Sequence, residues 1–236
     1  MKKILIALLL TGAGVLSAKA QSVKWIAEAG LSESTFSSGN TVNKGSGTLN
    51  NSYTMRAGFH GGLTAEFSFS NFSVDPGIQY SQRGGNVHYT YSEVFSTSTA
   101  NIVGDEQTTI NYIEVPVNVL YHFKSAGSVS FFAGAGPYIG YGLSGRSKGS
   151  TTVTQTVSSG NSANTTTQTY TQDVSEEFGT GEDNRIIYGA NATAGITFAK
   201  NFRFGVGYYY DVSGVFNGAS PKIHNNALKF TLGYAF

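Results

Sequence analysis

Apolar and polar side chains alternate along most of this sequence after residue 21. Alternation with period two puts neighbouring side chains on opposite faces of a β-strand. The clearest case is 55–69, where one face reads Met55, Ala57, Phe59 and the other reads Arg56, Gly58, His60. The pattern recurs about eight times in all, so we expect an all-β fold. The other segments are 23–31, 72–80, 113–123, 129–143, 186–198, 202–212 and 228–236.

The lengths of these segments favour a membrane. A tilted strand needs about nine to eleven residues to cross hydrocarbon, whereas strands of soluble proteins centre on about five or six. No Asp, Glu, Lys or Arg occurs on the apolar faces. A Lys or Arg at the bilayer midplane of a barrel costs about 2 to 4 kcal/mol, so lipid contact explains their absence. The alternative is a soluble β-sandwich whose core these faces form.

The connections between the segments alternate in length, as a barrel threaded through an outer membrane requires. We therefore predict an eight-stranded antiparallel transmembrane β-barrel, an up-and-down meander formed by residues 21–236 as one domain. Both termini are expected in the periplasm and the long loops outside the cell. Short connections fall at 70–71, 125–127 and 200–201, and long ones at 32–53, 84–111, 144–185 and 213–227.

Aromatic residues gather beside the short connections, where they are expected to form a girdle at the inner membrane interface. The last strand ends on Phe236, and a terminal aromatic residue of this kind is what the outer-membrane insertion machinery commonly recognises. Phe236 is therefore the predicted insertion signal. The expected girdle comprises Phe67, Phe69, Phe72, Tyr121, Phe123, Phe131, Phe198, Phe202, Phe204 and Tyr234.

Residues 1–20 have the pattern of a cleaved signal peptide: Lys2 and Lys3, an apolar run, then Ala18-Lys19-Ala20. The chain contains no cysteine, which excludes disulfides, thiolate metal sites and a lipid anchor at the cleavage site. Membrane attachment would then depend on the strands, with outer-membrane lipids as partners. The net charge of +1 gives no basic surface for nucleic acid.

Four passages carry a resemblance to a known family: residues 58–67, 79–85, 112–116 (Tyr-Ile-Glu-Val-Pro) and 136–141 (Gly-Pro-Tyr-Ile-Gly-Tyr). Through them the whole mature chain resembles the PorT-like small outer-membrane β-barrels of Gram-negative bacteria. The resemblance implies a location in the outer membrane. It also implies a link to the secretion and surface delivery of other proteins, the process from which that family takes its name.

The inward faces carry charges of both signs in similar number, which favours an ion-paired lumen filled by side chains over an ion-selective pore. Glu66 and Asp75 should lie opposite each other, so we expect Lys24 or Arg203 to reach them. Glu28 and Lys229 should form a salt bridge where the first and last strands meet. The predicted structural network is Lys24, Glu28, Arg56, Glu66, Asp75, Glu114, Arg203, Asp211 and Lys229, and His60 and His122 share these faces.

No residue pattern indicates an enzyme, a metal site or a cofactor. The histidines, which include His88 and His224, lack a metal-ligand spacing. His88 or His224 with loop serines is a formal candidate for a lipid-modifying hydrolase, but serine is so common here that coincidence is the better explanation. The inward glycines at 134, 136, 140 and 142 could mimic a phosphate-binding loop, but such a loop needs a helix after it and none follows here. They more simply make room for large side chains opposite.

The 144–185 segment is Thr-rich and alternates locally around a Ser-Ser-Gly-Asn turn, so it either extends its two strands as a protruding hairpin or forms a solvated loop. A protruding strand edge can capture partner strands. Our leading hypothesis is a non-enzymatic surface barrel whose loops mediate interactions or envelope integrity. The alternatives are an accessory role in protein secretion and a narrow passive pore.

Overall fold

The computed structural model describes residues 22–38, 42–44, 47–123, 128–159, 162–176, 184–215 and 222–236. Almost all of them lie in antiparallel strands, and none lies in a helix long and apolar enough to span a bilayer. The expected signal peptide lies outside these residues. The strands are β1 Ser22–Ser38, β2 Val42–Lys44, β3 Gly47–Thr54, β4 Arg56–Phe69, β5 Phe72–Phe95, β6 Ser98–Phe123, β7 Val129–Ser159, β8 Ser162–Glu176, β9 Ile186–Phe198, β10 Phe202–Asp211 and β11 Ile223–Ala235.

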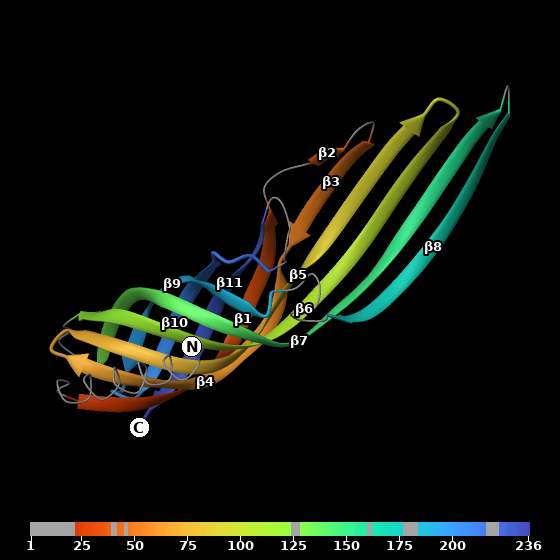
Figure 1. Cartoon of the computed structure of the whole chain (residues 1–236). Coiled ribbons are helices and arrows are strands. Elements are labelled where there is room, and N and C mark those ends of the chain that lie inside the picture. The colour runs from red at the N-terminus through yellow and green to blue at the C-terminus, as the bar shows by residue number, and fades with distance from the viewer. Residues whose placement is uncertain are drawn as a thin grey trace, which may run out of the picture.

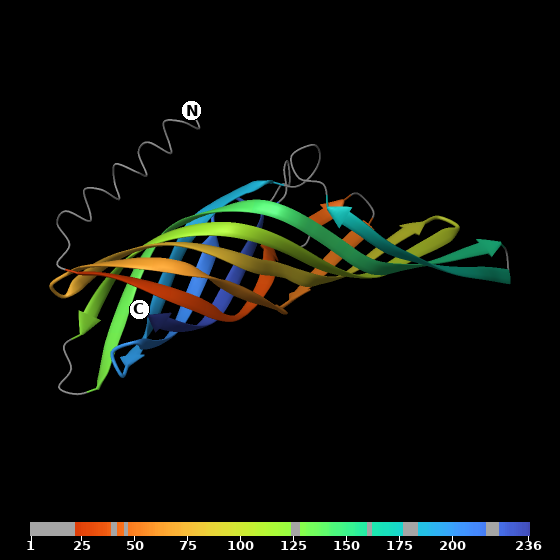
Figure 2. The same ribbon diagram turned by 90° about the horizontal axis from the view of Figure 1, so that it is seen from below.

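Eight of these strands form a closed barrel, as the sequence predicts (Figures 1 and 2). Each strand pairs with the next around the ring, in the order β1, β4, β5, β6, β7, β9, β10, β11. Pairing of β1 with β11 closes it. At that seam the amide of Phe236 donates to the carbonyl of Trp25 at 2.9 Å, so the last residue is held beside the first strand.

The predicted short connection at 70–71 is a two-residue turn, because Phe69 pairs directly with Phe72. Ser70 adopts a φ of 59°, which such a turn requires. The connection at 200–201 is also a turn, and Phe198 pairs with Phe202 across it. The connection at 125–127 lies outside the described residues.

The predicted long loops are wrong for two of the connections, because their residues continue the strands. β5 and β6 remain paired without a shift from Phe72 and Tyr121 to Phe95 and Ser98, through the whole segment expected to be a loop at 84–111. β7 likewise runs on to Ser159 and turns back as β8, so the hairpin alternative for 144–185 is the correct one. Strands β3, β5, β6, β7 and β8 thus form a twisted sheet, here called the extension, that projects beyond the barrel (Figure 1).

The other two long connections are shorter than predicted. β1 continues to Ser38, and β2 and β3 then form a hairpin whose second strand pairs with β5. β11 begins at Ile223 rather than near residue 228, which leaves 212–222 as the connection to β10.

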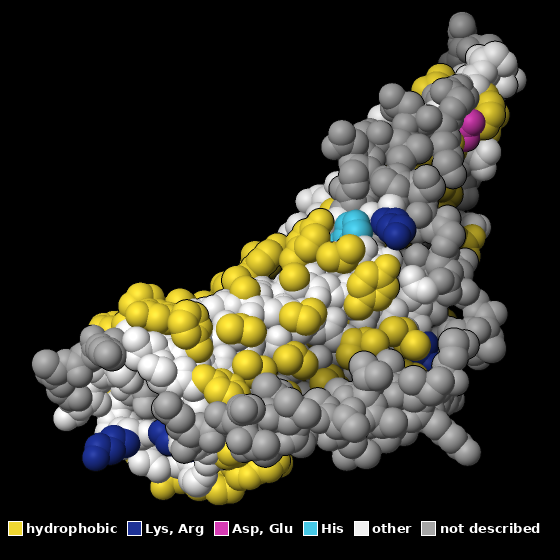
Figure 3. All heavy atoms as spheres, turned by 60° about the vertical axis from the view of Figure 1, so that its left-hand side comes forward, with side chains coloured by type: hydrophobic (Ala, Val, Ile, Leu, Met, Phe, Trp, Pro, Cys, Tyr) yellow, Lys and Arg dark blue, Asp and Glu magenta, His cyan; other side chains and the backbone are white. Residues whose placement is uncertain are grey.

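Large hydrophobic side chains are exposed on the outward face of the barrel, and Figure 3 shows many of them on one side. Rings meet at the short-turn end: Phe72 and Tyr121 are 5.0 Å apart between centroids, and Phe198 and Phe202 are 5.2 Å apart. Of the predicted girdle, Phe67 is the exception, since it is buried. A second set of outward aromatic residues lies toward the extension, at Phe59, Tyr80, Tyr141, Tyr188, Tyr208 and Tyr210. Two aromatic belts bounding an apolar band are typical of a membrane barrel.

The strands bend where the extension leaves the barrel (Figure 1). On β5 this point is Gly84, whose φ is 156° and where a Cβ would collide with the carbonyl oxygen of Thr108. On the β6–β7 pair it is a register shift between Asn111 and Tyr112. A glycine and a β-bulge are common means of bending a sheet.

Candidate functional site

The lumen near the short-turn end contains an ion-paired cluster. Arg203 of β10 contacts Glu66 of β4, and its Nη1 lies 3.3 Å from Oδ2 of Asp75 on β5. Register pairs on either side place Glu66 opposite Asp75, so two carboxylates face one guanidinium. This is the contact that the sequence predicts for Arg203. Lys24 pairs with Glu66 in the β1–β4 register, but its side chain is exposed at the barrel end.

A second cluster lies deeper and is fully buried. Glu114 of β6 accepts an ion pair from Nε of Arg83 at 2.7 Å and another from Nζ of Lys229 at 2.6 Å. Gln79 donates to the same carboxylate at 2.9 Å. The ring of Tyr209 lies 4.1 Å from the Lys229 ammonium. Because buried charges are costly unless they are paired and hydrogen-bonded, Arg83, Lys229 and Glu114 compensate one another in the lumen.

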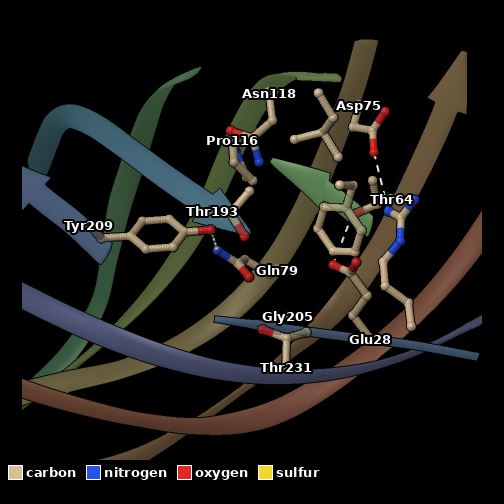
Figure 4. A pocket seen from close by; sticks show the side chains of 13 residues that line it. Glu28, Thr64, Asp75, Gln79, Pro116, Asn118, Thr193, Gly205, Tyr209 and Thr231 are labelled. Atoms are coloured by element: carbon tan, nitrogen blue, oxygen red, sulfur yellow. Dashed lines mark hydrogen bonds and ion pairs between the residues drawn. The ribbon is translucent and has the colours of Figure 1, made fainter. Parts of the chain in front are cut away.

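A small cavity of about 60 Å³ separates the two clusters. Figure 4 shows its lining: Thr64 donates to Glu28 at 3.0 Å, and Gln79 reaches the Tyr209 hydroxyl at 3.4 Å. Side chains from all sides of the barrel converge here. A volume of this size accommodates a few water molecules and no substrate.

Above the second cluster an apolar layer fills the lumen, formed by Phe36, Ile110, Tyr112, Tyr138, Ile187, Tyr209, Val215 and Ala227. Of the glycines that the sequence predicts to make room for large side chains, Gly140 does so in this layer, whereas a Cβ at Gly134 or Gly136 would first meet the backbone of β6. Gly189, which is not among them, makes room as well. A Cβ at Gly140 would lie 2.8 Å from Ile187, and one at Gly189 would lie 2.8 Å from the Tyr138 ring. The described side chains thus fill the lumen in layers.

The predicted salt bridge between Glu28 and Lys229 is wrong. The β1–β11 register pairs Glu28 with Gly233 and Lys229 with Ser32, so the two residues stand four positions apart along the seam. Strands of a closed barrel are staggered, and sequence position alone does not reveal that stagger. Glu28 instead accepts from Thr64, and Lys229 pairs with Glu114.

Two further members of the predicted network lie elsewhere. Arg56 lines a polar hollow with Gln82 and Asn111, away from both clusters. Asp211 is buried at the far end of β10 and accepts hydrogen bonds from the amide and hydroxyl of Ser213 at 2.9 and 2.6 Å. Asp211 therefore orders the turn after β10 rather than joining the ion pairs.

Arg83 is the main residue that sequence reasoning missed. The predicted strand ends at Tyr80, which leaves Arg83 just before the predicted loop at 84–111. Continuing the period-two pattern from Asp75 through Gln79 would have placed Arg83 on the inward face.

The histidines do not assemble into a catalytic or metal site in the described structure, where no group of three or more potential ligands occurs. His60 contacts Thr231 at 3.0 Å and His122 contacts Ser73 at 2.9 Å, both inside the barrel. His88 contacts Asp105 at 2.8 Å on the surface of the extension, and His224 stacks on Tyr210.

Sequence comparison agrees with this geometry. Residues 19–217 match the family described as "Outer membrane protein beta-barrel domain". The chain belongs to this family of outer-membrane β-barrels. No curated protein matches it.

Among solved structures, this outer-membrane barrel is similar to three bacterial ones, each covering 92% of it. Ail, the attachment invasion locus protein of Yersinia pestis, is 16% identical with a TM-score of 0.40, and all of Ail is covered. Neisserial surface protein A is 15% identical with a TM-score of 0.37, also over its whole length. OprG of Pseudomonas aeruginosa is 11% identical with a TM-score of 0.41, over 97% of that chain.

The extension gives this outer-membrane barrel a large polar surface beyond its apolar band. On the β7–β8 hairpin, threonine hydroxyls pair across the strands in a row: Thr152 with Thr169 at 3.1 Å, and Thr154 with Thr167 at 3.3 Å. Within the described structure β8 pairs only with β7, so its other edge is open. The residues of β8 are exposed along this edge.

Proposed function

We propose that this protein is a non-enzymatic surface protein of the outer membrane, whose extension binds a partner outside the cell. The observation that carries the proposal is the extension itself, a paired sheet that continues beyond the second aromatic belt and ends in the open edge of β8. The filled lumen supports a scaffold rather than a transport role. Paired strands hold this surface in one shape, which lowers the entropic cost of binding.

In this proposal residues 1–20 are removed after export, Phe236 serves as the insertion signal, and both termini face the periplasm. Outer-membrane barrels have short periplasmic turns and long outer loops, which supports placing the extension outside the cell. The chain has no cysteine, so a single introduced thiol reports its own location. Ser158→Cys should react with a membrane-impermeant maleimide on intact cells, and Lys200→Cys at the opposite end should react only after lysis. The reverse pattern would refute this orientation.

The proposed mode of binding is addition of a partner strand to β8. Edge strands are usually protected by proline, lysine or a bulge. β8 contains no Pro, Lys or Gly, and its charged residues, Asp173 and Glu176, stand near its end. Capture of an extended segment through backbone hydrogen bonds is the mode that suits such an edge.

Two adjacent proline substitutions test this mode. Successive amides of an antiparallel strand point alternately to either side. Of Thr166→Pro and Thr167→Pro, one therefore removes an amide that faces β7 and the other removes an amide of the open edge. The proline on the open edge should leave the hairpin paired with β7 and therefore resistant to protease, which identifies that variant. In it, adhesion of intact bacteria to host cells or matrix should fall. Unchanged adhesion in that variant, and in a strain lacking residues 150–171, would refute the proposal.

The alternative proposal is an accessory role in protein secretion, which rests on the resemblance to PorT-like barrels. A deletion strain would then fail to export cargo proteins while the hairpin-deleted variant exported them normally. A narrow passive pore is the third possibility, and single-channel recordings of refolded protein test it. Steady, reproducible conductance would favour the pore over both other roles.

A further inference from the structure

A polar hollow of about 450 Å³ lies where the extension leaves the barrel. Strands β4 to β8 contribute its lining, including Arg56, Gln82, Asn111, Arg146 and Lys148. We propose that this hollow binds the phosphate of a phosphorylated glycolipid of the outer leaflet, the chemical class of lipid A. The inference rests on the proposed orientation, with the extension outside the cell.

The hollow stands directly above the lipid-facing surface. Counting along β5, the outward residue before Gln82 is Tyr80, whose ring packs on Phe59 at 5.4 Å. The Tyr80 hydroxyl donates to Oδ1 of Asn111 at 2.7 Å, and the Asn111 amide donates to Ser144 at 2.9 Å. The aromatic belt and the hollow are thus joined by hydrogen bonds. A ligand with a head group in the hollow would place acyl chains against the apolar band, which a soluble anion would not use.

The charges of the hollow favour an anion. Arg56 makes no ion pair or hydrogen bond with any described residue, and its Nε is buried. Arg146 and Lys148 share one carboxylate, with Asp173 at 2.6 Å from Nε of Arg146 and 3.6 Å from Nζ of Lys148. The hollow is thus lined by three cations and no acid, and Asp173 is the one carboxylate within ion-pair distance of them among the described residues. An adjoining hollow, which Lys148 also lines, contains Asp105 and Glu106, and Asp105 is paired there with His88.

The side-chain chemistry fits phosphate in particular. A guanidinium offers a planar set of donors that matches phosphate oxygens, and a lysine beside it adds a compact charge. Basic pockets at the level of the head groups are a recognised means of binding anionic lipids. An unpaired buried donor such as Arg56 Nε is costly, so a ligand that accepts from it stabilises the site.

Native mass spectrometry of the refolded full chain tests the proposal. The probes are bisphosphorylated lipid A, the same lipid after enzymatic dephosphorylation, and inorganic phosphate. The wild-type chain should retain one bisphosphorylated lipid A and bind the dephosphorylated lipid about tenfold more weakly, as expected for loss of a charged hydrogen bond. Arg56→Gln should weaken retention to a similar degree. Lys148→Gln should also weaken retention, and because this side chain is exposed the substitution does not put folding at risk.

Lys200→Gln is the matched control, since it removes one positive charge at the opposite end of the barrel. Equal retention of the dephosphorylated lipid, or equal loss in Lys200→Gln, would overturn the proposal. Inorganic phosphate bound through Arg56 without retention of lipid A would also overturn it and assign a soluble anion instead. If the thiol at residue 158 reacted only after lysis, the proposed function would fail while lipid A binding in vitro stood, so the two failures are distinguishable.

Discussion

Strand β5 crosses two regions of the molecule, and its faces exchange character between them. In the barrel its outward residues are apolar, from Phe72 to Tyr80, and its inward residues are polar, from Asp75 to Arg83. In the extension the same outward face carries Asn86, His88, Thr90 and Ser92, and the opposite face carries Val87, Tyr89 and Tyr91. The exchange falls at Gly84, where the strand bends.

The difference follows from what surrounds each region. Lipid outside the barrel favours apolar side chains on its outward face. The extension lies beyond the apolar band, so its outward face is not under this constraint. On the other face, rings cover the sheet: a Cβ at Gly104 would collide with Tyr89, whose hydroxyl contacts Thr151 at 2.7 Å. Aromatic rings laid across glycines stabilise neighbouring strands. The point at which the alternation inverts therefore marks the end of the membrane-spanning part.

The largest expected effect comes from Glu114→Gln in the barrel. It would leave Arg83 and Lys229 buried without their shared carboxylate, at a cost of about 3 to 5 kcal/mol. Urea unfolding of the refolded protein, followed by heat-modifiable gel mobility, measures it. Glu106→Gln is the matched control on the same strand in the extension and should change stability by less than about 0.5 kcal/mol. Similar losses in both would show that the two regions do not differ in this way.

A lysine scan of the outward face of β5 sharpens the comparison. Ile78→Lys places a charge against lipid and should cost about 2 to 4 kcal/mol. Thr90→Lys, on the same face in the extension, should cost almost nothing, because its side chain is partly exposed on a polar surface. Folding yield into liposomes with a urea titration gives both values. A costly Thr90→Lys would mean that lipid or protein covers the extension.

Much of the barrel could be predicted from the sequence. Lipid on one side of each strand makes the alternation strong, so the sequence predicts all eight barrel segments and the turn at 70–71. The contact of Arg203 with Glu66 and Asp75 follows from that turn, since it puts the two carboxylates opposite each other.

The extension and the seam could not be predicted in the same way. In residues 84–111 the outward positions are no longer apolar, and Thr, Ser and Asn are frequent. Such a composition predicts a loop, although the backbone of this segment stays paired. The pairing of Lys229 with Glu114 joins strands that are far apart in sequence, and it depends on a stagger that no local pattern encodes.

Gly84→Ala tests the junction between the two regions. The added Cβ would collide with the carbonyl oxygen of Thr108, so the substitution should cost more than about 1 kcal/mol. Hydrogen exchange should rise mainly in 84–111, while the barrel strands stay protected. Gly205→Ala is the control, because its nearest neighbour would be 3.6 Å away. Equal exchange in both variants would mean that the bend does not depend on Gly84.

The smallest expected effect concerns the ion pair at the base of the β7–β8 hairpin. A hydrogen bond from Arg146, with both side chains about half exposed, lowers the pKa of the Asp173 carboxyl. Its contribution to hairpin stability is therefore present above the pKa of an unfolded aspartate and is lost as the pH falls through the folded value. NMR spectra of the hairpin amides should show slight fraying in the wild type when the pH falls below the pKa of Asp173 in the folded protein. Asp173→Asn should show no such pH dependence. Because the pair is solvated, fraying should also grow with salt, unlike the buried pairs of the barrel. A hairpin insensitive to both would show that the threonine row and the backbone ladder hold the extension without help from charge.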